Sequence, residues 1–176
     1  MSAEQPNILG FLTDDHAQWA ANCYGTTEIQ SPNLDRLAAT GIRMTRAFTP
    51  SPVCSPARAC FFTGRFPSQH GIHDWLDETG TEGSPDLSGQ TTIAELLQQS
   101  GYETALVGKW HCGGSRHPQP GFDRWFSYWD NQYPHCGEQC FSDQGCLVTE
   151  HGHQATLFTD RVIDFLRGRD TQKPFF

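Results

Sequence analysis

Several features are missing from this 176-residue sequence, and each absence excludes a class of protein. No apolar run approaches the roughly 20 residues that a membrane-spanning helix needs, so no membrane partner is expected. No basic cluster occurs, and a net charge of −8 argues against nucleic acid as a partner. The start of the sequence lacks the charged and long apolar regions of a signal peptide. We expect a cytoplasmic protein, or a periplasmic or secreted one if an export signal was removed.

A regular disulfide framework is also missing, because the seven cysteines are odd in number and widely spread. In a reducing compartment most of them would be free thiols. The last three follow His135 with the spacing C-x₃-C-x₅-C, which matches no common zinc pattern. Zinc binding, a local disulfide and ordinary buried thiols all stay open for this group, which consists of Cys136, Cys140 and Cys146.

The most informative stretch covers residues 51–65, SPVCSPARACFFTGR. Pro56 lies early in a helical pattern and Gly64 follows it, which predicts a loop leading into a helix of about two turns. Cys54 would then lie at a helix N-terminus, where free N–H groups and the helix dipole favour negative charge. We therefore predict that Cys54 is the catalytic position of a hydrolase acting on an anionic ester, with Arg58 one turn beyond it.

A pair of carboxylates follows the first apolar run of the chain. Residues 7–13 (NILGFLT) read as a strand buried on both faces of a largely parallel sheet, and Asp14 and Asp15 come directly after it. Neighbouring side chains on a strand point to opposite faces, so these carboxylates converge only if the chain turns there. Converging carboxylates need a cation, and hard oxygen ligands suit Ca²⁺ or Mg²⁺. Alternatively, one Asp caps the next segment and the other is solvated.

Three further helices are predicted from capping signals and periodicity. Residues 31–41 begin with Ser-Pro and end with Gly, residues 92–101 begin with the capping box Thr-x-x-Glu, and residues 154–167 are amphipathic. The first of these helices should bury a stripe formed by Leu34, Leu37 and Ala38.

Polar residues follow another predicted strand, residues 102–107, as in an α/β sheet that places its ligands at strand ends. Lys109 offers a compact positive charge there, and His111 can exchange protons near neutral pH. The alternative is an exposed lysine and a packed histidine. Residues 42–48 read as a short strand, whereas residues 116–153 look rich in loops.

The irregular region between residues 66 and 89 contains two residues that could reach a site, His70 and Trp75. A lone histidine in a loop is more often structural or solvated, so His70 is a weak candidate. Residues 173–176 (KPFF) look like the opening of a buried strand. Because a domain seldom ends on an unpaired apolar run, we expect a fragment of a longer protein whose site is incomplete.

The Cys54 segment resembles the hallmark of the sulfatase family, Cys-x-Pro-x-Arg followed by Thr-Gly. Other stretches resemble the same family in the same order and together span residues 6–126, and residues 173–176 also fit. These stretches are Pro6-Asn7-Ile8-Leu9, Asp14-Asp15, Ser31-Pro32-Asn33-Leu34-Asp35-Arg36-Leu37-Ala38, Ala47-Phe48, His70-Gly71, Gly108-Lys109-Trp110-His111 and Gly121-Phe122-Asp123.

The resemblance implies an α/β fold like that of alkaline phosphatase, with a mixed, largely parallel sheet between helices. Residues 1–176 would form the N-terminal part of the catalytic domain, and the remainder with a smaller C-terminal subdomain would be absent. The resemblance also implies that further metal ligands, a second histidine and another lysine of the family would lie beyond residue 176. The fragment alone is therefore expected to be inactive.

The resemblance also implies a modified residue and a metal ion. A formylglycine-generating maturation enzyme would convert Cys54 into an aldehyde whose hydrate attacks sulfur. Asp14, Asp15 and position 54 would hold the metal, which is Ca²⁺ in this reading, with Mg²⁺ or Mn²⁺ as alternatives. Arg58 would fix the hydrated aldehyde, Lys109 would stabilise charge on the sulfate, and His111 would accept a proton as sulfate leaves.

The expected activity is sulfuric ester hydrolysis, with a small sulfated sugar, choline sulfate or an aryl sulfate as substrate. One alternative is a phosphonate or phosphate ester hydrolase of the same superfamily. Another is a non-catalytic binding protein that keeps Cys54 unconverted. A plain cysteine hydrolase would need a nearby histidine base, and it would explain neither the Asp14-Asp15 pair nor Lys109.

Overall fold

The computed structural model describes residues 5–77, 85–130 and 135–176. The chain divides into two units, of which one comprises Met1–Gly10 with Pro50–Phe176 and the other comprises Phe11–Thr49. Each unit is described by itself. In the described ranges, no helix has both the length and the apolar character needed to cross a bilayer.

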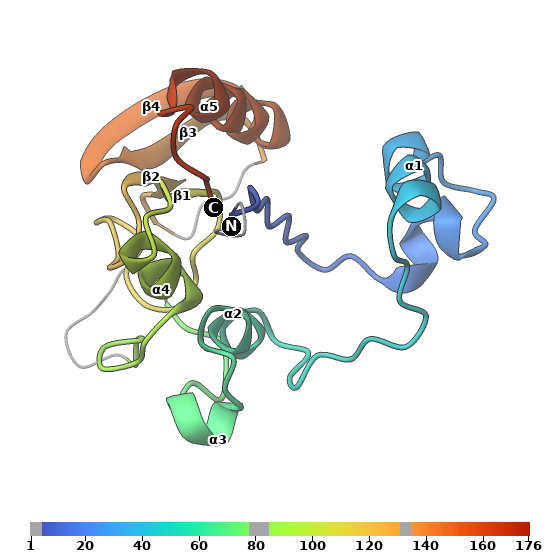
Figure 1. Cartoon of the computed structure of the whole chain (residues 1–176), viewed down its shortest axis with the longest axis horizontal. Helices are drawn as coiled ribbons and strands as arrows, with labels where there is room; N and C mark the ends of the chain where they lie inside the picture. The colour runs from blue at the N-terminus through green and yellow to red at the C-terminus, as the bar shows by residue number, and fades with distance from the viewer. Residues whose placement is uncertain (1–4, 78–84, 131–134) are drawn as a thin grey trace. The chain divides into compact units, whose positions relative to one another are not determined.

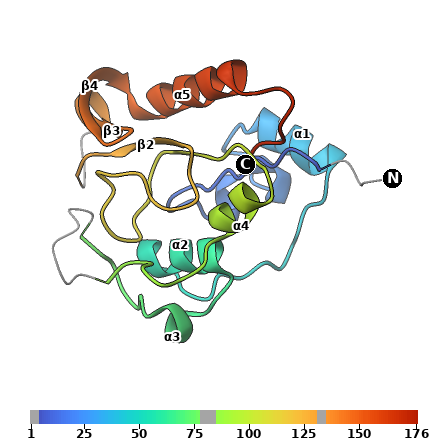
Figure 2. The same cartoon turned by 60° about the vertical axis from the view of Figure 1, so that its left-hand side comes forward.

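A four-stranded mixed sheet forms the centre of the larger unit. β1 pairs with β2 in parallel, and β2 with β3 and β3 with β4 pair in antiparallel fashion. The sheet lies between α5 on one side and α2 and α4 on the other (Figures 1 and 2). The elements are α2 (Cys54–Thr63), α3 (Pro67–His70), α4 (Ile93–Gln99), β1 (Ala105–Val107), β2 (Arg124–Tyr128), β3 (Cys136–Asp143), β4 (Cys146–His153) and α5 (Gln154–Gly168).

Residues 173–176 continue the sheet beyond β1, as expected for a strand opening. The Phe176 N–H donates to the Glu103 carbonyl (3.0 Å), and Glu103 forms a parallel bridge with Phe175. On the far side of this segment, the Ile8 N–H donates to the Phe175 carbonyl (2.8 Å). The sheet order therefore passes from residue 8 through residue 175 to β1.

The strand predicted over residues 7–13 is wrong, because these residues have no regular secondary structure. Leu9, Phe11 and Leu12 are 66, 82 and 46% exposed. An apolar run becomes a strand only where its backbone groups pair with neighbours. In this run the Ile8 N–H pairs with the Phe175 carbonyl. Apolar composition alone did not supply the remaining pairing.

The expectation of a loop-rich region between residues 116 and 153 was also wrong, since β2, β3 and β4 lie there. Gln144 and Gly145 connect β3 to β4 with φ values of 52° and 86°. Two consecutive residues with positive φ are typical of a type I′ turn, which suits the twist of a two-residue β-hairpin. The polar residues and cysteines of both strands hid the apolar alternation that would have indicated them.

The core of this unit lies between α2 and the sheet and is largely aromatic. Trp110 is 2% exposed and Trp125 is 1% exposed, and their ring centroids lie 5.7 Å apart. Phe62 of α2 packs against Trp110 at 4.8 Å. The two indoles meet edge-to-face and the Phe62 ring is tilted against Trp110, and such contacts add to the burial of apolar area. They join α2 firmly to the loop that follows β1.

Two of the predicted helices flank this core as expected. At the start of α4, Thr92 Oγ1 accepts the Glu95 N–H (3.2 Å) and the Glu95 carboxylate accepts the Thr92 N–H (2.8 Å), which is the predicted capping box. α5 packs its Phe158 ring against Phe141, with the ring centroids 5.5 Å apart. Local capping and periodicity therefore predicted both helices correctly.

The smaller unit contains two 3-10 turns, η1 (Gln18–Ala20) and η2 (Asn22–Tyr24), and the helix α1 (Pro32–Thr40). The predicted helix is confirmed, but its buried stripe is wrong. Leu37 is 65% exposed, and no residue of α1 is buried. Within this unit α1 packs against η2, which is too short to cover an apolar helix face.

The short strand predicted over residues 42–48 is likewise wrong, because the segment has no strand hydrogen bonding. Ile42 is 91% exposed and Phe48 is 88% exposed. Their β-branched and aromatic side chains suit a sheet surface, but β-propensity reflects packing against neighbouring strands rather than a backbone preference. The described part of this unit contains no strand to supply that surface.

Candidate functional site

The site begins where α2 starts. Val53 is extended (φ −109°, ψ 142°) and Cys54 is the first residue of the helix, so Cys54 lies in the first turn, half-buried. The helix ends at Gly64, whose φ of 66° lets its N–H donate to the Cys60 carbonyl (2.8 Å). The predicted loop and two-turn helix are confirmed. The first-turn N–H groups and the helix dipole favour an anion beside residue 54.

Arg58 connects this helix to the loop that follows β1. Its side chain is buried, and Nη1 donates to the Lys109 carbonyl (2.7 Å). A guanidinium carries a positive charge, so this bond places a buried cation between α2 and the loop that contains Lys109. The sequence predicted that Arg58 reaches back towards residue 54, and the structure shows it bound to the neighbouring loop.

The loop after β1 carries the two other predicted catalytic side chains. Trp110 anchors it in the core, with half-buried Lys109 on one side and His111, 1% exposed, on the other. His111 Nε2 lies 2.7 Å from the Leu76 carbonyl. Because a carbonyl only accepts hydrogen bonds, this contact assigns the ring hydrogen to Nε2 and leaves Nδ1 as the basic atom of the neutral imidazole.

A third segment, residues 72–77, closes the arrangement. The Leu76 N–H donates to Ser55 Oγ (3.0 Å), and the Leu76 carbonyl accepts the His111 bond. The backbone of Leu76 therefore links Ser55, the residue after Cys54, to His111. Sequence reasoning missed Ser55 and Leu76, because Ser55 occupied a variable position of the motif and Leu76 acts through its backbone.

Asp14 and Asp15 belong to the smaller unit and meet the condition that the sequence placed on them. Asp15 has a φ of 48°, and the carboxylate oxygens of the two residues lie within 4.8 Å of each other. The turn therefore brings adjacent carboxylates to one side of the chain. Both are exposed, and Ala17 rather than either Asp precedes η1 as its cap. Two convergent hard oxygen donors fit a divalent cation such as Ca²⁺ or Mg²⁺.

His70 has a structural environment. It is buried, Ile72 N–H donates to its Nδ1 (3.1 Å), and its Nε2 lies 3.3 Å from Cys60 Sγ. Burial lowers the pKa of His70, with a smaller contribution from His73, and burial raises the pKa of the Cys60 thiol. Both groups are therefore neutral at pH 7, and the pair braces α2 against α3.

The cysteine group on the hairpin does not converge. Cys136 pairs with His153, Cys140 with Thr149, and Cys146 with Asp143 at the other end of the hairpin. All three are free thiols. The described residues of the hairpin hold no cluster of metal ligands and no disulfide. The thiols are free, but Cys136 and Cys146 are exposed, so the expectation of buried thiols is wrong for these two.

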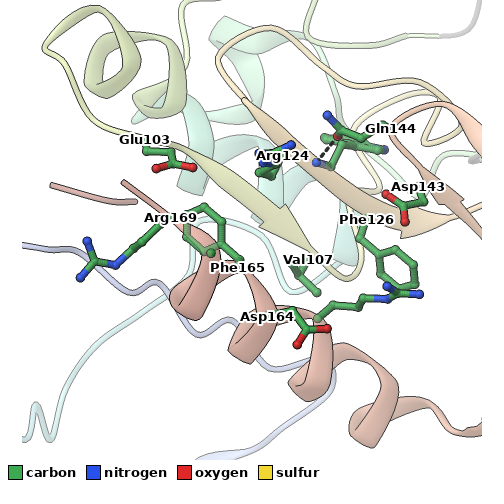
Figure 3. Close-up of a pocket in the computed structure, with 12 residues that line it drawn as sticks. Glu103, Val107, Arg124, Phe126, Asp143, Gln144, Asp164, Phe165 and Arg169 are labelled. Carbon is green, nitrogen blue, oxygen red and sulfur yellow. Dashed lines mark hydrogen bonds between the residues drawn. The ribbon is translucent and has the colours of Figure 1, made fainter. Parts of the chain in front are cut away.

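A cavity of about 240 Å³ lies elsewhere in the larger unit, between the sheet and α5 (Figure 3). None of the predicted site residues lines it. Its acidic and basic side chains are equal in number, and one of them, Arg161, pairs with Glu150 and lies over the Phe126 ring. This balance of charge gives no preference for an anion. The charged residues around it are Glu103, Asp143, Asp164, Arg124, Arg161 and Arg169.

Comparison with known families decides the relationship. The family model described as Sulfatase matches residues 6–176. This chain belongs to the sulfatase family. Members of the family use a metal ion and a formylglycine residue, and the positions that carry the family pattern here are the ones assembled above.

Curated sulfatases match along most of this sulfatase chain. The N-acetylglucosamine-6-O-sulfatase of Bacteroides thetaiotaomicron is 38% identical over 175 residues, which cover 98% of the chain and 29% of the relative. Human N-acetylgalactosamine-6-sulfatase is 36% identical and again covers 98% of the chain, with 38% of the relative. Human steryl-sulfatase is 42% identical but covers 69% of the chain and 21% of the relative.

Solved structures confirm the predicted fold class. A protein solved in complex with its substrate D-glucosamine-2-N,6-O-disulfate has a TM-score of 0.83 and 37% identity to this sulfatase chain. That alignment covers 98% of the chain and 33% of the solved protein. A structure in complex with a neocarrahexaose has a TM-score of 0.82 at 24% identity, covers 98% of the chain and 44% of the solved protein, and shows the fold alone. The chain thus spans about a third of these solved and curated relatives.

Proposed function

We propose that the protein to which this chain belongs hydrolyses sulfate monoesters, with residue 54 as the position of the nucleophile. The observation that carries this proposal is the arrangement in the larger unit. Arg58 bonds to Lys109 at one side of the first turn of α2, and Leu76 connects Ser55 to His111 at the other. The match to the sulfatase family supports sulfate ester hydrolysis as the reaction.

The nucleophile would come from modification of Cys54 to formylglycine by a maturation enzyme, which supplies a hydrated aldehyde in place of a thiol. Residues 54–58 keep the Cys-x-Pro-x-Arg spacing that the resemblance associates with this conversion. The dipole of α2 and the buried Arg58 cation favour the anionic form of a group at this position. If Cys54 stayed a thiol, the roles proposed for Asp14, Asp15 and Lys109 around the hydrated aldehyde would not apply.

Lys109 and His111 would have different roles in the reaction, one as a positive charge and the other as a base. Lys109 contributes a compact cation that stabilises negative charge on the sulfate as the ester bond breaks. His111 holds its hydrogen on Nε2 through the Leu76 carbonyl, so Nδ1 is the atom that accepts a proton during release of sulfate. The backbone bond fixes this tautomer, which a freely rotating histidine would not keep.

The carboxylates of Asp14 and Asp15 would hold the divalent metal, for which we propose Ca²⁺. Such an ion would polarise sulfate oxygens and lower the pKa of a bound hydroxyl. Both carboxylates are exposed and adjacent, so they repel each other when no cation is bound. They supply part of a coordination shell, and the remaining ligands would come from other segments of the full-length protein.

For the substrate we propose a 6-O-sulfated hexosamine. The two curated relatives that cover 98% of this chain are named for 6-sulfated amino sugars, whereas steryl-sulfatase matches a smaller part of it. The solved structure at 37% identity also contains a 6-O-sulfated glucosamine. The cytoplasm, or the periplasm after export, is the proposed location.

The direct test is sulfate release by the full-length gene product, produced together with a formylglycine-generating enzyme. We expect turnover of N-acetylglucosamine 6-sulfate that exceeds turnover of the matching phosphate and phosphonate esters. Loss of at least about 100-fold in kcat is expected for Lys109→Ala, in line with removal of one charge-stabilising group. Faster hydrolysis of the phosphate or phosphonate ester than of the sulfate ester would identify a phosphorus ester hydrolase instead.

A further inference from the structure

Trp75 is a large aromatic residue whose position the catalytic assignments do not use. Its side chain is 53% exposed, although Ile72, three residues earlier, and Leu76, the next residue, are 1 and 9% exposed and lie in the core. An exposed indole between two buried anchors is costly for a soluble surface, because apolar area facing water contributes unfavourably. Exposed aromatic side chains held by a rigid scaffold are typical of ligand sites.

The backbone next to Trp75 is bonded to the catalytic elements. The Leu76 N–H donates to Ser55 Oγ beside Cys54 (3.0 Å), and the Leu76 carbonyl accepts from His111 (2.7 Å). The Trp75 N–H donates to the Asp74 carboxylate at 2.7 Å. These bonds hold the backbone of Trp75 beside the residues that position the reaction.

The indole also touches a catalytic side chain directly. Its ring lies edge-to-face against the His111 imidazole, with the centroids 5.3 Å apart and an interplanar angle of 81°. His111 is only 1% exposed, so Trp75 forms part of its cover. The remaining half of the indole surface faces solvent beside the candidate site.

We propose that Trp75 is a specificity-determining residue whose indole packs against the apolar face of the sugar ring that carries the sulfate ester. This inference rests on the proposed function and names the part of the substrate that the site recognises. A pyranose presents a flat C–H face that covers an aromatic ring, and its hydroxyls stay available to polar groups. Trp75 thus binds the leaving group, whereas Lys109 acts on the sulfate.

The experiment compares Trp75→Ala and Trp75→Phe in the full-length, matured protein. Three substrates separate the sources of the effect: glucosamine 6-sulfate, 4-nitrophenyl sulfate and the acyclic ethyl sulfate. For Trp75→Ala we expect KM for glucosamine 6-sulfate to rise about tenfold relative to KM for ethyl sulfate. Any effect of uncovering His111 falls on kcat and is shared by all three substrates, so the comparison between substrates isolates the contact with the sugar. Trp75→Phe should recover most of the loss. Leu147→Ala, which removes an equally exposed (53%) apolar side chain on β4, is the control.

Equal losses on all three substrates, or an unchanged KM for the sugar, would overturn the proposal. A rise confined to 4-nitrophenyl sulfate would overturn the pyranose assignment. Calorimetric titration of glucosamine 6-sulfate into the Cys54→Ser protein, with and without Trp75→Ala, gives a readout that needs no turnover. If the wild type lacks sulfatase activity but Trp75→Ala weakens this binding about tenfold, the proposed function fails and the role of Trp75 stands. Binding unaffected by Trp75→Ala would refute that role even in an active enzyme.

Discussion

The hydrogen bond between Ser55 and Leu76 links α2, the helix that begins at Cys54, to the segment that holds His111. Ser55→Ala removes this hydrogen bond. Ser55 is 0% exposed, and its Oγ accepts the Leu76 N–H at 3.0 Å. After the substitution the Leu76 N–H loses its acceptor inside the protein. Leaving a buried donor unsatisfied costs about 1–3 kcal/mol, which corresponds to a factor of roughly 5–150 in a local equilibrium.

Amide hydrogen exchange is the assay that isolates this effect, because it reports the local opening free energy of each segment. In the full-length protein we expect Ser55→Ala to accelerate exchange at residues 72–77 by about 5–150-fold. The orientation of His111 depends on the Leu76 carbonyl, so kcat for sulfate release should fall as well. Peptide mass spectrometry of residue 54 checks that maturation still occurs.

A second buried serine supplies the matched control. Ser127 is also 0% exposed, but the described residues offer its hydroxyl no hydrogen-bond partner. Ser127→Ala removes a hydroxyl that was desolvated without compensation, so it should be neutral or stabilising by about 1 kcal/mol. If Ser55→Ala leaves exchange at residues 72–77 as slow as Ser127→Ala does, the reasoning about Leu76 is refuted.

Further predictions concern stability and can be checked by thermal and urea unfolding of the full-length protein. Gly121→Ala should destabilise it by roughly 2–4 kcal/mol, because φ is +90° and the new Cβ would lie 2.4 Å from the Glu95 backbone nitrogen. Gly137→Ala, at φ +97° with nothing within 4 Å, should cost only about 1 kcal/mol; equal losses would contradict the steric argument. Thr92→Ala should cost about 1 kcal/mol through loss of the capping box, and an unchanged midpoint would count against it. Burial lowers the pKa of His70 below its usual 6.5, so the unfolded state binds the extra proton first as the pH falls. The contribution of neutral His70 to stability is therefore full above about pH 6.5 and is lost as the pH drops towards the folded pKa. His70→Gln should flatten this dependence on pH.

Local signals predicted the helices well. Gly64 ends α2 in the left-handed conformation, and the Thr92–Glu95 box begins α4, as the sequence pattern indicated. Caps act through bonds between residues a few positions apart, so a sequence window contains all the partners. This is why α2, the helix that carries residue 54, was placed nearly to the residue.

The strands were predicted poorly, because a strand forms only beside neighbouring strands that a short sequence window does not contain. The apolar residues 7–13 and 42–48 satisfied the strand pattern but have no ladder to complete it, whereas β3 and β4 pair through the Gln144–Gly145 turn despite a polar composition. Register and pairing come from tertiary neighbours and turn geometry rather than from propensity. The local signal that the sequence does contain for that hairpin is Gly145, because glycine favours the positive φ that such a turn requires.

The candidate site divides in the same way. Cys54, Arg58, Lys109 and His111 were predicted from the family pattern, and Arg58 and Lys109 are in fact bonded. The contribution of Leu76 was not predictable, since its backbone N–H and carbonyl make the contacts and its side chain only fills the core. The sequence named Trp75 as a residue that could reach a site, but only the structure showed the contact between its ring and His111.

Conversion of Cys54 to formylglycine can be decided by the mass of the peptide containing residue 54, taken from the full-length protein made in cells that carry a formylglycine-generating enzyme. Replacement of the thiol by an aldehyde removes sulfur and two hydrogens and adds one oxygen, so we expect a peptide about 18 Da lighter than the encoded sequence. The lighter peptide should increase in proportion to sulfate-releasing activity. A fully unconverted cysteine in a preparation that still releases sulfate would contradict the account.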